Sequence, residues 1–313
     1  MARYRDSLPQ LGGETFLTDG GLETTLIFHE GLELPEFAAF VLLETEEGRR
    51  QLRGYLEPYL RIAREKGLGF VLDTPTWRAN PDWGAKLGYD AAGLRRINMA
   101  AVRELIALRE TWETPGAPLV VSGAIGPRGD GYKAGRSGIE EAERYHAPQI
   151  AAFAEADADM VGAFTLTGTD EAAGIARAAA AQGMPCSISF TVETDGRLVD
   201  GTSLRDAIAT VDAETGASPA YYLINCAHPT HFELALEPGE PWMERIRGIR
   251  ANASAKSHAE LDESDSLDIG DPEDLARRYR ALRDRLPRLR LLGGCCGTDH
   301  RHVRAICEAW LPA

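Results

Sequence analysis

The chain has 313 residues, of which 44% are hydrophobic and 26% charged, a composition typical of a folded protein with a sizeable core. Asp and Glu total 48 against 34 Lys and Arg, and the resulting net charge of −14 argues against nucleic acid or an anionic membrane surface as a partner. The sequence contains no signal-peptide-like run and no apolar stretch of membrane-spanning length, so we expect a cytoplasmic protein that acts on a small neutral or cationic molecule.

Short apolar runs alternate with longer segments of helical periodicity along nearly the whole chain, which is typical of repeated βα units. The predicted strands cover residues 16–21, 69–75, 119–125, 160–166, 186–191, 221–225, 246–252 and 289–293. The predicted helices cover residues 48–66, 94–111, 139–156, 171–182, 203–215, 272–286 and 299–310. Gly67 and Gly183 are interpreted as helix ends, and Thr169-Asp170 and Asp271-Pro272 as helix starts.

Repeated βα units without a Rossmann glycine fingerprint favour a closed barrel over an open doubly wound sheet, because closure removes both sheet edges. We therefore predict an α/β fold, a (β/α)8 TIM barrel, with residues 1–313 forming a single domain. The chain is longer than the usual barrel of about 250 residues. The extra length is predicted to lie in loops, chiefly at residues 28–44, 127–138 and 256–271.

Residues that carry chemistry collect where the predicted strands end, which is where catalytic residues lie in this architecture. Asp19-Gly20-Gly21 ends the first strand and Asp73-Thr74 the second, while Asn225-Cys226 ends the sixth. The eighth strand ends in Gly293-Gly294-Cys295-Cys296-Gly297. The predicted active site therefore lies at this end of the barrel.

Five cysteines are an odd number, and two of them are adjacent, which favours thiol or metal chemistry over disulfides. Only one strand separates strands six and eight, so the sulfurs of Cys226, Cys295 and Cys296 are predicted to converge. Three thiolates on a tetrahedral Zn²⁺ leave the fourth position for a substrate, and soft sulfur donors argue against Mg²⁺ or Ca²⁺. The flanking glycines permit the bent backbone that two consecutive ligands need. Cys186 and Cys307 are interpreted as buried core residues.

With these segments the sequence resembles the zinc-dependent homocysteine S-methyltransferases, which include betaine- and S-methylmethionine-using members and the homocysteine domain of cobalamin-dependent methionine synthase. The resemblance covers almost the whole chain, and its two cysteine segments are the most specific. It is carried by Asp19-Gly20-Gly21-Leu22, Gly126-Pro127-Arg128-Gly129-Asp130-Gly131-Tyr132, Ser189-Phe190-Thr191, Asn225-Cys226-Ala227-His228-Pro229 and Gly293-Gly294-Cys295-Cys296-Gly297.

The resemblance implies a (β/α)8 barrel in which Cys226, Cys295 and Cys296 ligate zinc. It also implies that the Asp19-Gly20-Gly21 turn helps to hold the amino-acid part of the thiol substrate. Zn²⁺ bound to a thiol favours deprotonation and supplies a thiolate nucleophile at neutral pH. The thiolate then needs only in-line alignment with a methyl group of a sulfonium or quaternary ammonium donor.

The chain departs from the family pattern after the fourth strand. Relatives usually carry a glutamate there that binds the amino group of homocysteine, whereas Phe164 stands at this position, and an aromatic ring cannot accept the strong hydrogen bonds of an ammonium group. Glu23 is a candidate replacement, with a solvent-exposed loop glutamate as the alternative. The segment Asp73-Thr74-Pro75-Thr76-Trp77 also differs from the usual Thr-Asn-Thr-Tyr, and Asp73 either orients a substrate or hydrogen-bonds a loop.

Other residues near the predicted mouth are open to more than one interpretation. Trp77 and Tyr132 either attract a methylated cation through their ring faces or pack within loops. Asn225 adjoins the metal cysteine and belongs to the predicted substrate-binding set. His228 is interpreted as a helix-start residue or as a group that supports the metal ligands, and His302 as a surface residue.

The predicted function is methyl transfer from a small onium donor, of the S-methylmethionine, S-adenosylmethionine or betaine type, to a zinc-activated thiol, foremost homocysteine to give methionine. The alternative within enzymes is a methyltransferase or demethylase for a different thiol or onium compound. A zinc-dependent hydrolase is a lower alternative, because such sites favour histidine and carboxylate ligands, and so is a non-enzymatic zinc or thiol protein. No cobalamin- or folate-binding module is evident, so the donor is expected to be free in solution.

Overall fold

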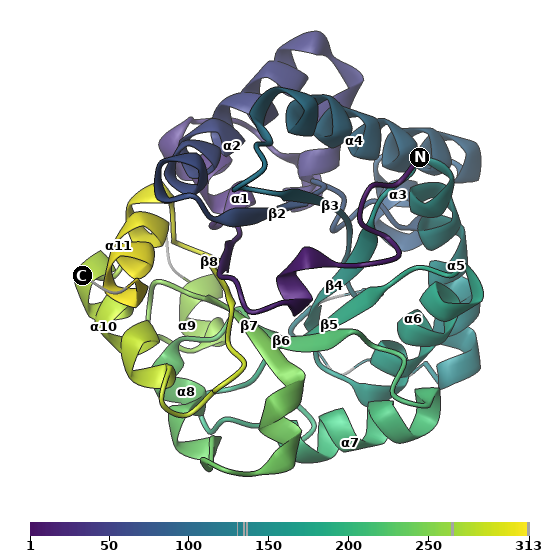
Figure 1. The fold of residues 1–313 in the computed structure, drawn as a ribbon. Coiled ribbons are helices and arrows are strands. Elements are labelled where there is room, and N and C mark those ends of the chain that lie inside the picture. Colours follow the sequence, from purple (N-terminus) through teal and green to yellow (C-terminus); the bar gives the residue numbers. More distant parts are fainter. Residues whose placement is uncertain (130, 134, 136, 264–265, 312–313) are drawn as a thin grey trace.

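The computed structural model describes residues 1–311 apart from residues 130, 134, 136, 264 and 265. Within this part of the chain, parallel strands pair in sequence order and β1 also pairs with β8, so the sheet closes into a barrel surrounded by helices (Figure 1). The strands are β1 (Phe16–Leu17), β2 (Gly69–Asp73), β3 (Leu119–Ile125), β4 (Met160–Leu166), β5 (Cys186–Phe190), β6 (Tyr221–Asn225), β7 (Ile246–Ala251) and β8 (Leu291–Gly294). The predicted (β/α)8 TIM barrel is confirmed.

The helices lie between and after the strands. The α-helices are α1 (Leu22–Thr24), α2 (Glu46–Lys66), α3 (Pro81–Lys86), α4 (Ala91–Trp112), α5 (Ile139–Glu155), α6 (Thr169–Ala181), α7 (Leu204–Thr215), α8 (Pro229–Phe232), α9 (His258–Asp262), α10 (Pro272–Leu282) and α11 (His300–Trp310). Short 3-10 helices cover Pro9–Leu11, Pro35–Phe37, Ala39–Glu44, Glu233–Ala235 and Pro241–Arg245, and a π-helix covers Thr25–His29. Among the residues described, no helix has the length and apolar character that crossing a membrane requires.

The strands form where the apolar runs predict them, because strands of a barrel covered by helices are buried on both faces. Every residue of β3, for example, is buried. The first strand is shorter than predicted and ends at Leu17, although Thr18 N still donates to Leu292 O and Gly294 N to Asp19 O. These two hydrogen bonds keep the following residues beside β8.

Capping residues set several helix ends. Thr45 Oγ1 accepts a hydrogen bond from Gly48 N at the start of α2, and Gly67, with a φ of 65°, ends that helix. Asp271 caps α10 ahead of a proline, as predicted, and Gly183 follows α6 in the left-handed conformation. Local side-chain chemistry therefore explains where these helices begin and end.

The loop prediction is wrong for part of residues 256–271, because this segment contains α9. Ser257 and Glu260 form a capping box in which each side chain accepts from the other residue's backbone N–H, and this stabilises the first turn of a helix. The predicted loop at residues 28–44 includes short 3-10 helices. That residues 1–313 form one domain stays a prediction.

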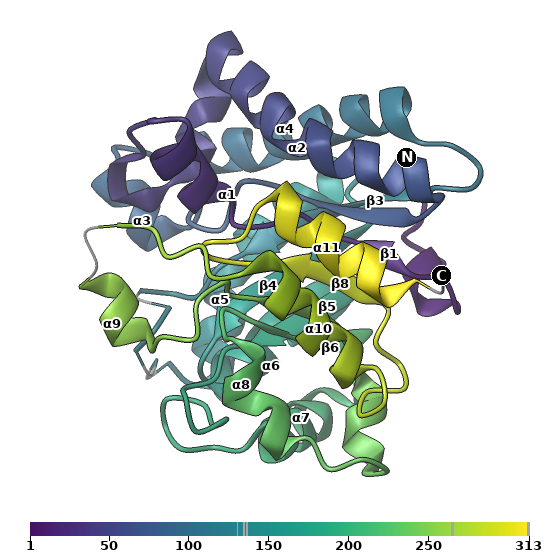
Figure 2. The ribbon, with the colours of Figure 1, turned by 90° about the vertical axis from the view of Figure 1, so that its left-hand side faces the viewer.

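The amino-terminal residues close one end of the barrel. Gln10 Nε2 donates to Met160 Sδ at 3.2 Å and to Tyr221 Oη at 3.4 Å inside the ring of strands. The short helix Pro9–Leu11 lies across the centre of the ring (Figure 1). Figure 2 shows the amino terminus and the end of α11 towards this end, and α1, α3 and α9 at the other. The carboxyl ends of the strands therefore remain available for a site.

Candidate active site

Three cysteine thiols meet at the carboxyl end of the barrel. Cys226 directly follows β6, and Cys295 and Cys296 directly follow β8. The Sγ atom of Cys226 lies 2.7 Å from that of Cys295 and 3.8 Å from that of Cys296, and all three lie within 4.8 Å of one another. Cys186 and Cys307 are buried elsewhere. The fold thus brings together the three cysteines that the sequence singles out.

The backbone of Cys226 is left-handed, with a φ of 54°, a conformation that costs a non-glycine residue about 1–3 kcal/mol. Three hydrogen bonds fix it. Cys226 N donates to Arg250 O at 3.1 Å, and Cys226 O lies 3.0 Å from the donor Asn252 Nδ2 and 2.5 Å from His258 Nε2. These contacts hold the turn that carries the first sulfur.

The glycines around the cysteine pair have two physical roles. Gly297 has a φ of 77° and supplies the bend after Cys296 that the sequence predicts. Gly294 and Gly293 are required by close packing instead, because an added Cβ would lie 2.0 Å from Thr298 Oγ1 and 1.8 Å from Thr18 Oγ1, respectively. A larger residue at either position would require the Thr298 or Thr18 side chain beside it to move.

The three thiols change one another's pKa. Hydrogen bonds from Cys295 and Cys296 hold the pKa of Cys226 well below its usual range. The hydrogen bond to Cys226 in turn raises the pKa of Cys295 to about 12, and the pKa of Cys296 is also raised. A single thiolate therefore forms readily, whereas three thiolates this close together need a cation between them.

The donor set fits a metal ion that prefers sulfur. Tetrahedral coordination with Zn–S bonds of about 2.3 Å separates neighbouring sulfurs by about 3.8 Å. The distance between Cys226 Sγ and Cys296 Sγ is 3.8 Å, whereas Cys226 Sγ and Cys295 Sγ, 2.7 Å apart, have to separate by about 1 Å to bind the same ion. Among the residues that the structure describes, no fourth His, Cys, Asp or Glu joins this group. Three ligands leave one coordination position open, as in catalytic zinc sites.

The cysteines line an open cavity of about 720 Å³, a volume that includes solvent space at its mouth. Every residue predicted to bind metal or substrate also lines it. These are Asp19, Gly20, Gly21, Glu23, Trp77, Tyr132, Phe164, Asn225, Cys226, Cys295 and Cys296. Of the motif residues that carry the resemblance, Asp130 lies outside the described part of the chain.

A buried arginine that the sequence does not single out lines this cavity and reaches across the barrel. Arg250, near the end of β7, donates from Nη1 to Asp73 Oδ2 at 2.6 Å and from Nη2 to Asp19 Oδ1, and its Nε donates to Gly294 O at 3.2 Å. Tyr55 Oη donates to the other oxygen of Asp19 at 3.0 Å. Both Asp19 oxygens are therefore engaged within the protein. The sequence does contain a signal for this arginine. Asp19 and Asp73 end neighbouring predicted strands, and two buried carboxylates need a cationic partner.

Phe164 and Glu23 face the same cavity. The Arg250 guanidinium lies 5.0 Å from the centre of the Phe164 ring, so this ring packs against a cation of the chain itself. Glu23 is partly buried in the first turn of α1, which contradicts the alternative of a solvent-exposed loop residue. Burial raises the pKa of Glu23 to about 7, and the nearby charges of Cys295 and Asp19 add to this shift. A cation beside Glu23 would favour its ionised form.

Trp77 and Tyr132 lie between this cavity and an outer cavity of about 1130 Å³, and both residues line both spaces. Tyr132 Oη donates to Cys226 Sγ at 3.5 Å. Trp77 Nε1 donates to Phe164 O at 3.4 Å, and the Arg78 guanidinium lies 5.1 Å from the Trp77 ring. The predicted aromatic pair therefore lies where the two cavities meet.

Asn225 links the ends of three strands. Its Oδ1 accepts from Thr165 N at 2.9 Å and from Ser189 Oγ at 2.6 Å, and its Nδ2 donates to Thr165 Oγ1 at 3.0 Å. Thr165 is left-handed, with a φ of 61°. Asn225 therefore fixes the irregular backbone of β4 after Phe164, where the register with β5 shifts, as well as lining the cavity.

The chain matches known proteins over nearly its whole length. The model of a family described as Homocysteine S-methyltransferase matches residues 16–310. The homocysteine S-methyltransferase of Escherichia coli (strain K12) is 27% identical over 316 residues, which cover 94% of each chain.

Solved structures of the homocysteine methyltransferase MmuM from Escherichia coli show the same fold. Its oxidized form gives a TM-score of 0.71 at 23% identity and covers 97% of this chain and 98% of that one. Its metallated form gives a TM-score of 0.70 at 22% identity and covers 94% and 96%.

Proposed function

The chain belongs to the homocysteine S-methyltransferase family, and from this premise we propose that it is a zinc-dependent methyltransferase that moves a methyl group from a small onium donor to homocysteine, giving methionine. The observation that carries the proposal is the meeting of Cys226, Cys295 and Cys296 on the wall of a cavity at the carboxyl end of the barrel. The existence of a metallated form of the similar MmuM enzyme supports a metal in this role.

Cys226, Cys295 and Cys296 would hold the zinc ion. When bound, zinc favours deprotonation of the substrate thiol and so supplies a thiolate near neutral pH. Tyr132, whose hydroxyl donates to Cys226 Sγ, orients the first of these sulfurs. A reduced site with three thiols is suited to the cytoplasm, where we expect the protein to act.

The turn Asp19-Gly20-Gly21 forms the wall beside the acceptor. A Cβ at Gly21 would lie 2.6 Å from Cys295 O, and one at Gly20 would lie 2.7 Å from Thr298 O, so only glycine lets this turn pack so closely against the cysteine segment. Glu23, which follows the turn, supplies a carboxylate for the amino group of homocysteine in place of the glutamate that Phe164 replaces. An ammonium group favours such a charged acceptor.

The onium donor enters through the outer cavity and meets the acceptor between Trp77 and Tyr132. Their ring faces favour a methylated cation, and their bulk keeps water away from the reacting sulfur. In-line alignment of donor methyl and thiolate is then the main requirement of the step. The methyl–onium bond breaks as the sulfur–methyl bond forms, and its electron pair leaves with the donor.

A purified-protein assay tests the proposal. Homocysteine is combined in turn with S-methylmethionine, S-adenosylmethionine and betaine, and methionine is measured by mass spectrometry. We expect methionine with at least one donor, and none with Cys226→Ser. Metal-free protein that transfers methyl groups at the full rate would contradict the proposal.

A different thiol or onium substrate is the second candidate function, and Phe164 at the position of the family's glutamate favours it. The same assay with a panel of other thiols distinguishes the two. Glu23→Ala tests the role of Glu23, because it is expected to weaken the binding of homocysteine while leaving the zinc content unchanged. Unchanged affinity for homocysteine would contradict that role.

A further inference from the structure

The loop between β3 and α5 carries Tyr132 to the boundary between the two cavities. Tyr132 Oη donates to Cys226 Sγ at 3.5 Å, and the centre of its ring lies 4.4 Å from that of His258. Tyr132 belongs to no helix or strand, so its position depends on how the loop backbone is held. Arg128 and Lys133, on either side of it, both contact the segment that follows β4.

A buried glutamate in the first turn of α6 accepts a hydrogen bond from the first part of this loop. Glu171 is 7% exposed, and its Oε1 accepts from Arg128 N at 2.6 Å. A Cβ added at Gly135 would lie 3.7 Å from Glu171 Oε2, so the loop lies against both oxygens of this carboxylate. The Arg128 side chain, by contrast, pairs with carboxylates at the surface, where ion pairs contribute little. Glu171 is therefore the buried contact that fixes the loop ahead of the tyrosine.

A buried histidine holds the Glu171 carboxylate in turn. His146 lies on α5, and its Nε2 is 2.9 Å from Glu171 Oε1. Because a carboxylate oxygen only accepts hydrogen bonds, Nε2 carries the proton and donates it. One oxygen thus accepts from two donors, the imidazole of His146 and the N–H of Arg128. The start of α6 is thereby tied both to the loop and to the helix that follows the loop.

A second buried contact holds the loop after Tyr132. Thr167, between β4 and α6, donates from Oγ1 to Lys133 O at 3.2 Å. Thr167 and Glu171 therefore hold the loop backbone on both sides of Tyr132 from one short segment. Neither side chain lines the cavity of the cysteines or the outer cavity. Any effect of these two residues on a substrate must therefore pass through the loop.

We infer that Glu171 and Thr167 are positioning residues that place Tyr132 at the boundary between the two cavities. The inference rests on the proposed function, in which the onium donor meets the acceptor beside this ring. Without the Glu171 carboxylate, the N–H of Arg128 loses its acceptor and the ring moves away from the path of the donor. Zinc and homocysteine bind as before, because their proposed contacts follow β1, β6 and β8.

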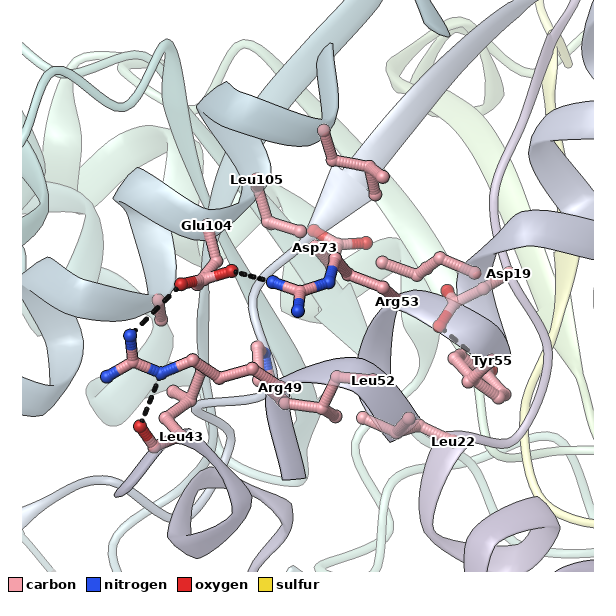
Figure 3. A pocket seen from close by; sticks show the side chains of 14 residues that line it. Asp19, Leu22, Leu43, Arg49, Leu52, Arg53, Tyr55, Asp73, Glu104 and Leu105 are labelled. Carbon is pink, nitrogen blue, oxygen red and sulfur yellow. Dashed lines mark hydrogen bonds and ion pairs between the residues drawn. The ribbon is translucent and has the colours of Figure 1, made fainter. Parts of the chain in front are cut away.

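Three variants separate positioning from general destabilisation. Glu171→Ala removes the carboxylate, whereas Glu171→Gln keeps an oxygen that can accept from Arg128 N. Glu104→Ala is the matched control, because Glu104 also accepts two hydrogen bonds, from Arg49 and Arg53 at 3.3 and 2.9 Å, but at the outer end of a pocket between α2 and α4 (Figure 3). The KM of homocysteine and the KM of the donor, S-methylmethionine, S-adenosylmethionine or betaine as the assay above determines, are measured with zinc content and thermal midpoint.

We expect Glu171→Ala to raise the KM of the donor about 10-fold while the KM of homocysteine and the zinc content stay within about 2-fold. Glu171→Gln should recover most of this loss, and Glu104→Ala should leave both KM values unchanged even where its thermal midpoint falls. Equal rises for donor and homocysteine would indicate a structural role and overturn the inference. A Gln variant as impaired as the Ala variant would overturn it as well.

A double-variant comparison tests whether the effect passes through the tyrosine. Tyr132→Ala alone removes the ring that Glu171 positions. In that background Glu171→Ala should change the KM of the donor by less than about 2-fold, because residues that act as one unit are not additive. A full additional 10-fold loss, as expected for about independent sites, would show that Glu171 acts by another route and would overturn the inference.

Hydrogen–deuterium exchange provides a readout that needs no turnover. Peptides that contain Arg128 and Tyr132 should exchange faster in Glu171→Ala than in wild type, and Glu171→Gln should restore the slower exchange. Thr167→Val keeps the shape of the side chain but removes the donor to Lys133 O, and it should also speed exchange. It replaces Glu171→Ala as the test should that variant fail to fold. Unchanged exchange in the folded variant overturns the inference.

Failure of the proposed function has a different signature, namely that no donor yields methionine in the assay. The exchange comparison then still decides whether Glu171 and Thr167 fix the loop. Faster exchange in the variants with no methionine from any donor would retain the positioning of Tyr132 and reject the donor assignment. Methionine formation with unchanged exchange would retain the proposed function and reject the positioning role.

Discussion

Cys226 Sγ lies 3.8 Å from Cys296 Sγ, although 70 positions separate the two residues in the sequence. Their meeting is a consequence of strand order, because β7 alone lies between the strands that deliver them. The first prediction concerns the metal that this arrangement is suited to hold.

Cys226→Ser should lower the zinc content at least about 10-fold, because two thiolates are a poor site for this ion. Zinc per chain is measured by elemental analysis after purification in limiting zinc. Cys186→Ala and Cys307→Ala are the matched controls, since both cysteines are buried away from the cavity. A site elsewhere in the protein would be indicated if Cys226→Ser kept the wild-type zinc content.

Removal of the metal should also lower stability. A ligand that binds only the folded state at 100 times its Kd stabilises that state by about 2.7 kcal/mol. We expect a chelator to lower the thermal midpoint of the wild type, and added zinc to restore it. Cys226→Ser should show neither shift. Equal chelator effects on the two proteins would argue against this site.

Arg250→Met should destabilise the fold by about 3–5 kcal/mol, because Asp19 and Asp73 would then be buried without a counter-charge. Urea unfolding at neutral pH measures the change. The double variant Arg250→Met with Asp73→Asn should recover part of the loss, since one uncompensated charge is removed. If the second substitution adds to the damage, the two aspartates do not depend on Arg250 as the contacts indicate.

The sequence predicts the barrel well, because its strands are apolar on both faces and differ sharply from the amphipathic helices. Cys226 and Cys295-Cys296 could also be predicted to meet, since strand order in a barrel follows chain order. The position of the Arg250 side chain inside the barrel could not be predicted in this way. Period-two alternation does not distinguish inside from outside when both faces of a strand are buried, and its partners Asp19 and Asp73 lie on other strands.

The structure differs from the sequence prediction at two further places, α9 and His302. Ser257 and Glu260, at capping-box spacing, indicate the start of α9. The segment was nevertheless predicted as a loop, because it is short and rich in acidic residues. His302 was expected at the surface because it lies in the first turn of α11, yet it is fully buried. Its Nδ1 accepts from Asp299 N at 3.1 Å, and its Nε2 lies 2.8 Å from Ile269 O. The burial of His302 is set by tertiary packing, which a single sequence does not reveal.

Asp299 connects stability to pH at the helix that follows the metal cysteines. It caps α11, and its Oδ1 accepts from Arg301 N at 2.8 Å. Burial opposes its ionisation, but the contact with His302 and the hydrogen bonds from Arg301 outweigh burial and hold the pKa of Asp299 below its usual value. The folded state therefore binds a proton more weakly than the unfolded state. The stabilisation is present above the unfolded pKa of about 4 and is lost as the pH falls below it.

Asp299→Ala should accordingly cost about 1–2 kcal/mol at pH values near 7, and the difference from wild type should shrink as the pH falls below about 4. Urea unfolding at a series of pH values measures this. Thr45→Ala is the matched control, because it removes a cap from α2 that carries no titratable group, so its cost should not vary with pH. If the cost of Asp299→Ala is equally constant, the carboxylate charge contributes nothing, and the cap acts through its neutral hydrogen bond alone.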